Sequence, residues 1–102
     1  MHTMANLITV FWRDIPAQVM AKERRTSAKV ELGSRFAEAI DHAAMRAGMV
    51  GTDAYLEQWR RVSVPCDGDL ESAAQEAAQK LEAEYDRDRL VALVKNMGEE
   101  PA

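Results

Sequence analysis

The sequence predicts an α+β protein: a single domain of residues 1–102 with an antiparallel or mixed sheet of three to four strands, helices on one face and a C-terminal helical segment. Stretches with strand-like alternation gather in the first third of the chain, and two substantial segments with helical spacing follow. A chain of 102 residues has room for one modest core. Its composition, 47% hydrophobic and 29% charged, is that of a folded globular chain.

Three strands are predicted in the first third. Residues 7–12, LITVFW, carry bulky side chains on both faces, which is typical of a central strand or of one with Trp12 emerging at its end. Pro16 cannot donate to a ladder, so the second strand is expected from about Gln18 to Lys22. Residues 28–32 alternate cleanly and predict a third strand.

Capping and stop signals delimit the helices. Ser34 is a candidate N-cap for a helix that ends at Gly48, and a short helical turn is expected at 54–58. Residues 59–64 then turn extended and end at Pro65. Asp69 is expected to cap a helix over 70–85, and Asp86 or Asp88 a last short helix that Gly98 stops. Residues 1–4 and 98–102 are predicted to fray.

Several observations point to a cytoplasmic location without membrane association. No apolar run approaches the roughly 20 residues of a membrane span, because Arg13 and Asp14 interrupt the first strand pattern. The N-terminal residues lack the basic and apolar regions of a signal peptide. Cys66 is the single cysteine and cannot form an internal disulfide, which fits a reducing compartment.

Charge is unevenly distributed along the chain. Residues 1–35 hold six basic and three acidic side chains, whereas residues 66–102 hold four basic and ten acidic ones. This asymmetry suggests electrostatic steering of a partner. Arginines beside Trp12 and Trp59 have the composition of a single-strand stacking platform, but the pI of 5.1 and the acidic last third disfavour nucleic acid.

No catalytic residue, metal site or cofactor is predicted. Cys66 lies in a turn before a helix, where it could be an activated nucleophile or a half-buried loop cysteine. His42, the only plausible base, is on a different element, and its spacing from Cys66 matches no catalytic signature. One cysteine and two histidines cannot build a structural zinc site.

Two tryptophan–arginine pairs are the most distinctive feature. Both fall at strand margins, and Trp and Arg are enriched in interface hot spots. They could instead be core tryptophans flanked by surface arginines. If the two strands are neighbours, the pairs would form one patch. The binding hypothesis therefore comprises six residues: Trp12, Arg13, Asp14, Trp59, Arg60 and Arg61.

The stretches ANLITVFWRDIPAQV, AKVEL, RFAEAIDHAAMRAG and GTDAYLEQWRR resemble the small bacterial "virulence factor" domain, which is also found as a segment of larger conserved virulence factor proteins. The resemblance runs from Met4 to about Leu93, and WRDIPAQV and DAYLEQWRR are its specific parts. The family name implies no reaction and carries no catalytic residues across. Small stand-alone members are associated with one-carbon and corrinoid methyl-transfer enzymes, so the resemblance implies an accessory role there.

Two functional hypotheses follow. The first is a non-catalytic accessory protein that binds a protein partner, of unknown identity, through the tryptophan–arginine patch. The alternative is a small subunit or ligand-binding accessory of folate or corrinoid methyl-transfer metabolism, in which Arg13, Arg60 and Arg61 would meet an anionic cofactor such as a folate.

Overall fold

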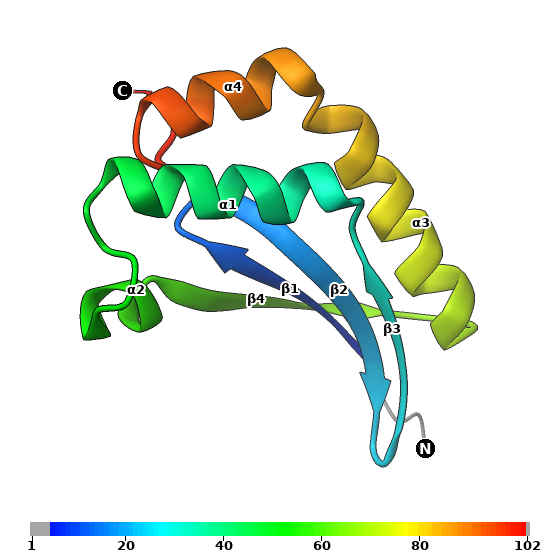
Figure 1. The fold of residues 1–102 in the computed structure, drawn as a ribbon. Helices are drawn as coiled ribbons and strands as arrows, with labels where there is room; N and C mark the ends of the chain where they lie inside the picture. Colours follow the sequence, from blue (N-terminus) through cyan, green and yellow to red (C-terminus); the bar gives the residue numbers. More distant parts are fainter. Residues whose placement is uncertain (1–4, 102) are drawn as a thin grey trace.

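The computed structural model describes residues 5–101, and its elements follow the order expected from the sequence. They are β1 (Ala5–Trp12), β2 (Ile15–Glu23), β3 (Thr26–Glu31), α1 (Ser34–Arg46), α2 (Asp53–Glu57), β4 (Trp59–Cys66), α3 (Leu70–Glu84) and α4 (Arg87–Lys95). The strands form one open sheet in the order β3–β2–β1–β4 (Figure 1). Every neighbouring pair is antiparallel, so the α+β prediction is confirmed and the sheet is not mixed. The fraying expected at residues 1–4 and at Ala102 concerns positions outside the described residues.

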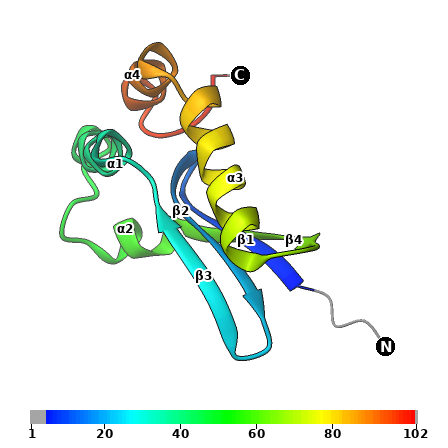
Figure 2. The same ribbon diagram turned by 90° about the vertical axis from the view of Figure 1, so that its right-hand side faces the viewer.

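The helices cover part of the sheet and leave residues 60–65 of β4 exposed. α3 packs across β2 and β3, while α1 packs on β2 and against α4. Figures 1 and 2 show α1 and α4 side by side, while α3 runs along the sheet from the end of β4 to the start of α4. The cross-strand partners Leu7, Ala21 and Ala28 share one face and join the core, whereas Ile8 and Met20 on the other face stay half exposed.

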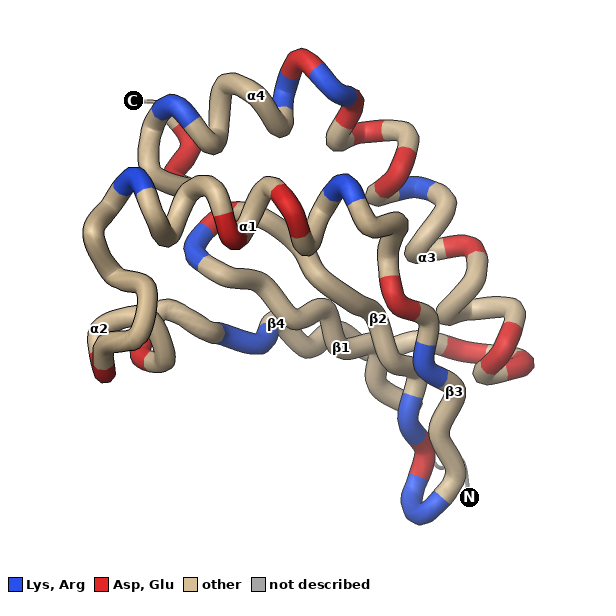
Figure 3. Tube along the Cα trace, in the orientation of Figure 1, with Lys and Arg blue, Asp and Glu red and all other residues tan. Residues whose placement is uncertain are grey.

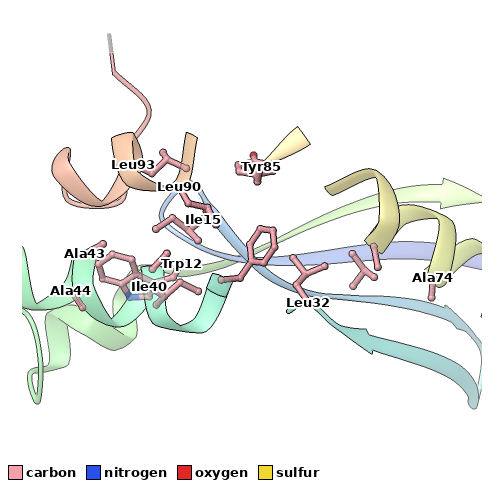
Figure 4. Packing of buried hydrophobic residues seen from close by; sticks show 14 of the residues in the cluster. Trp12, Ile15, Leu32, Ile40, Ala43, Ala44, Ala74, Tyr85, Leu90 and Leu93 are labelled. Atoms are coloured by element: carbon pink, nitrogen blue, oxygen red, sulfur yellow. The ribbon is translucent and has the colours of Figure 1, made fainter. Parts of the chain in front are cut away.

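The core is elongated and rich in alanine. At one end, Trp12 lies among side chains of α1, with Ala43 and Ala44 beside it, while Leu93 of α4 lies above Ile15 (Figure 4). At the other end Ala74 of α3 faces the sheet. The small side chains let the helix backbones approach closely, since a close-packed interior has little room for voids.

Two strands extend through prolines that were expected to interrupt or end them. β2 begins at Ile15 and includes Pro16, which is the cross-strand partner of Phe11 next to a register shift between Val10 and Phe11. β3 pairs with β2 only from Gln18 onward, so Pro16 lies at an open edge, where a missing amide is tolerated. β4 runs through Pro65 to Cys66, opposite Ala5.

The start of α1 also differs from the expectation. Gly33, not Ser34, is the N-cap residue, and no side chain caps this helix. Instead the Gly33 amide donates to Oε2 of Glu82 on α3 at 2.7 Å, so a tertiary contact satisfies a group that a local cap would usually satisfy. Asp69 and Asp86 cap α3 and α4 through their carboxylates.

Candidate functional site

The β1–β2 turn and the start of β4 bring the two tryptophan–arginine pairs together. Trp12 and Trp59 are direct cross-strand partners, and Arg13 and Asp14 form the two-residue turn that follows Trp12. Phe11 is the partner of Arg60 in the same register. We call the six residues Trp12, Arg13, Asp14, Trp59, Arg60 and Arg61 the Trp–Arg corner.

The indole of Trp12 is fully buried. Its Nε1 donates to the carbonyl of Tyr55 in α2 at 3.0 Å, and the two ring centroids lie 5.7 Å apart. Tyr55 also meets the half-buried ring of Trp59 edge-to-face at 6.1 Å. Tyr55 therefore joins the two tryptophans and anchors α2 to the sheet, in the geometry that aromatic pairs prefer.

The Arg13 guanidinium is directed into the protein. It donates to Oε1 of Gln58 at 3.2 Å, to the carbonyl of Met97 at 3.0 Å and to the sulfur of Met49 at 3.4 Å. Only 13% of its side chain is exposed, and its backbone has φ +53°, in the left-handed region that favours glycine. Three separate segments thus hold Arg13 in a conformation that costs energy.

Asp14 connects the turn to β4 and to the C-terminal segment. Its Oδ1 accepts from Nη2 of Arg60 at 3.1 Å, and its Oδ2 accepts from the amide of Glu100 at 2.7 Å. Its own amide donates to the carbonyl of Gly98 at 2.8 Å. The carboxylate therefore fastens both a neighbouring strand and the end of the chain.

Residues 98–100 are held against this turn, although the sequence predicted fraying from residue 98. Gly98 is buried, and the Glu100 carboxylate pairs with Arg89 of α4 at 2.7 Å. Glu99 lies 4.0 Å from the Arg13 guanidinium. The contacts of Gly98, Glu99 and the Glu100 amide with Arg13 and Asp14 join segments more than 80 residues apart in the chain, so local sequence could not reveal them.

Arg60 and Arg61 are the exposed cations of the corner. Arg60 donates from Nε to the carbonyl of Arg13 at 2.9 Å, and its guanidinium lies 4.6 Å from the Phe11 ring centroid. Its side chain remains 47% exposed. Arg61 is exposed and makes no hydrogen bond or ion pair within residues 5–101.

A small depression of about 320 Å³ adjoins the corner beneath α1. Tyr55 and Trp59 line it together with Gln18 and the carboxylates of Glu31 and Asp41. The aliphatic residues Ala17, Leu32, Ala37 and Ile40 complete its lining, and the Glu31 carboxylate is paired with Lys29 at 3.5 Å.

Cys66 has the opposite of an activated thiol's environment. Burial raises its pKa, and the negative charges of Asp67 and Glu23 raise it further, so the thiol stays protonated at neutral pH. His42 lies on α1 and lines the groove between α1 and α4.

Within the described part of the chain, no group of three or more His, Cys, Asp and Glu side chains could hold a metal ion. No helix in residues 5–101 is long and apolar enough to cross a bilayer.

The fold and the Trp–Arg corner define a small α+β domain in which the corner residues connect β1 to β4. The family model described as "Virulence factor" matches residues 10–94, most of the chain. The protein therefore belongs to the virulence factor family, as the resemblance implied. Neither a comparison with curated proteins nor one with solved structures gives a match.

The sequence analysis named the two tryptophan–arginine pairs and made their meeting conditional on neighbouring strands, and it missed the residues that complete the corner. Tyr55, Gln58 and Met97 contribute a carbonyl, an amide oxygen and a second carbonyl. Two of these acceptors are backbone groups, which leave no mark in a sequence. Tyr55 and Gln58 do fall inside the stretch DAYLEQWRR, which lies within the residues that the family model matches.

Proposed function

We propose that this protein is a non-catalytic interaction protein of the virulence factor family, and that an extended acidic segment of a partner adds to the open edge of β4. The observation that carries the proposal is the uncovered edge strand: residues 60–65 of β4 are all exposed. A bare strand edge is a template for pairing with another chain.

The direction of the backbone groups on β4 supports this role. The Arg13 amide donates to the Gln58 carbonyl at 3.1 Å, just beyond the Trp12–Trp59 pair. Hydrogen-bonded and non-hydrogen-bonded pairs alternate along an antiparallel ladder. Continuing that alternation turns the amides and carbonyls of Arg61 and Ser63 toward the open edge. The backbone nitrogen of Pro65 also faces the open edge in this alternation. Its missing amide hydrogen therefore removes no hydrogen bond to β1.

The side chains of β4 add specificity for an acidic strand. Arg61 is exposed and uncommitted within residues 5–101, and Arg60 is oriented by Asp14 and Phe11 before any partner binds. Val62 and Val64 are 40% and 46% exposed and share one face of the strand. A partner strand would gain main-chain hydrogen bonds from the edge, apolar contacts from the valines and carboxylate pairing from the arginines.

In this proposal the buried members of the corner act by positioning. Trp12 and Arg13 are enclosed by Tyr55, Gln58 and Met97. Because the Arg13 carbonyl accepts from Arg60, this enclosure fixes the position of the Arg60 side chain at the start of the exposed edge. The raised pKa of Cys66 is consistent with a role that does not use a thiolate nucleophile.

The test is site-specific photo-cross-linking in the native host, with benzoylphenylalanine placed at Val64 and, as a control, at the exposed Gln75 of α3. We expect one adduct of defined mass from Val64 and none of that mass from Gln75. Ser63→Pro removes an outward amide and should abolish the adduct, and Arg61→Glu should reduce it at least fivefold. No adduct at Val64, or an adduct insensitive to Ser63→Pro, would overturn the proposal.

A further inference from the structure

A second surface, unrelated to β4, lies between α1 and α4. These helices pack side by side and run in the same direction (Figures 1 and 2). A groove of about 590 Å³ lies between them. Its apolar lining consists of Ala39, Leu90, Val91 and Val94. Val91 is 44% exposed, which leaves a large apolar side chain in contact with water at the groove.

Basic side chains stand at both ends of this groove. Arg35 and Arg87 lie near the starts of α1 and α4, and Arg46 and Lys95 lie at their ends (Figure 3). The lining includes one carboxylate, that of Glu38. Arg35 is paired with Glu82, so three unpaired cations face one carboxylate, a local excess of positive charge on a protein whose net charge is −4.

Three of these cations are available for a ligand. The side chains of Arg46, Arg87 and Lys95 are exposed and make no hydrogen bond or ion pair within residues 5–101. Arg35 is bound to the end of α3, through the carbonyls of Glu82 and Tyr85 and the Glu82 carboxylate. Arg35 therefore contributes a fixed charge, while the other three can reach toward a ligand.

The spacing of the charges decides between kinds of ligand. Arg35 and Arg46 are 11 residues apart on α1, about 16 Å along a helix, and Arg87 and Lys95 are separated by about 12 Å on α4. Cations at opposite ends of the groove are therefore too far apart to converge on a single phosphate or carboxylate. An apolar centre with charge at both ends instead matches an elongated ligand.

We propose that the groove binds an amphipathic helix of a partner protein, three to four turns long, with an apolar central stripe and carboxylates near both ends. A third helix can pack its ridges into the groove between two neighbouring helices, and helix-in-groove recognition uses apolar anchors at i, i+3 or i+4, and i+7. Carboxylates at the ends would pair with the three available cations, Arg87 at one end and Arg46 and Lys95 at the other, and would set the position of the helix along the groove.

The protein's own acidic helix is not this ligand. α3 carries several Glu residues, but its buried residues Ala74 and Ala78 face β2 and β3 within the same chain. A second copy would have to unfold that contact to present an apolar stripe. The ligand is therefore a helix of another protein.

The probe is a fluorescein-labelled 16-residue peptide with Leu at helical spacing in its centre and Glu in its first and last turns, measured by fluorescence anisotropy at low and physiological salt. Matched peptides carry Lys in place of every Glu, or the same residues in an order that destroys the apolar stripe. We expect saturable binding of the Glu peptide, at least tenfold weaker binding of both controls, and weaker binding as salt rises.

Protein variants locate the binding site. Val91→Glu, which places a carboxylate in the groove, should weaken binding at least tenfold, whereas Val50→Glu, at an exposed valine outside the groove, should leave it unchanged. Arg87→Glu should weaken it at least fivefold, and Arg25→Glu at the β2–β3 turn should not. Circular dichroism of each variant checks that the fold is retained.

Three outcomes would overturn the proposal: failure of the Glu peptide to bind, equal binding of the Lys peptide, or full binding by Val91→Glu. Co-sedimentation with vesicles containing anionic lipid, lost in Val91→Glu and not competed by the peptide, would assign the groove to a membrane surface instead. Ser63→Pro changes β4 alone, so peptide binding by this variant separates the fate of this proposal from that of the edge-strand proposal.

Discussion

Gly98 lies directly against the indole ring of Trp12. A methyl group at Gly98 would come within 2.8 Å of Cζ3 and 3.2 Å of Cε3 of that ring, and within 3.5 Å of Cβ of Ala43. The backbone of Gly98 has φ +89°, and its carbonyl accepts the Asp14 amide. The end of the chain can therefore close over the first strand only because this position has no side chain.

This contact predicts a large effect for Gly98→Ala. The positive φ should cost about 1 kcal/mol, and the overlap with a fully buried ring a further ~1–3 kcal/mol. Gly48→Ala is the matched control, because Gly48 also has a positive φ, +70°, but no atom lies within 4 Å of an added methyl group. Urea unfolding should show Gly48→Ala losing about 1 kcal/mol and Gly98→Ala clearly more. Equal losses would mean that the indole contact contributes nothing.

At Arg13, replacement by glycine should destabilise the protein less than replacement by alanine. Arg13→Ala removes a guanidinium that serves Gln58 and Met97 and keeps the strained backbone, so we expect a loss of about 2–3 kcal/mol. Arg13→Gly loses the same contacts but relieves the left-handed strain, and it should be more stable than the alanine variant by about 1 kcal/mol. Chemical denaturation measures both variants. An alanine variant as stable as the glycine variant would contradict the strain.

Two proline substitutions test the backbone phase of β4. Ser63→Pro removes an amide that faces the open edge, and we expect its stability to stay within about 1 kcal/mol of the parent protein. Val62→Pro removes an amide that faces β1, and it should cost about 2–3 kcal/mol because a ladder hydrogen bond is lost. Thermal or urea unfolding of the two variants distinguishes them, and a reversed order would refute the assigned phase.

Cys66 should be a slow thiol. Because burial and two nearby carboxylates raise its pKa, alkylation by iodoacetamide should rise with pH at a higher midpoint in the folded protein than in protein unfolded by urea. The raised pKa has a consequence for stability as well. The folded state holds the thiol proton more tightly than the unfolded state does. The protonated thiol therefore contributes to the free energy of unfolding at neutral pH, and this contribution is lost as the pH rises from the pKa of the unfolded thiol through that of the folded thiol. A folded midpoint at or below the unfolded one would contradict the assignment.

Sequence patterns determined most of the fold because they report local physics. Alternating apolar residues predicted the strands, and Asp69 predicted the start of α3, since a capping carboxylate acts on an amide three residues away. The neighbouring placement of the two tryptophan–arginine pairs was stated only as a condition. The register of β1 and β4 fulfils it, with Trp12 opposite Trp59.

Only the tertiary structure decided which residues of the corner face inward. Trp12 is covered by Tyr55 and Gly98, and the Arg13 guanidinium donates to acceptors from three distant segments. Arg60 and Arg61 are therefore the exposed cations of the corner. The same holds for the basic groove, whose cations come from two helices about 50 residues apart in the chain. A sequence specifies the charge and size of each side chain, but backbone acceptors and long-range packing determine whether that side chain is buried or exposed.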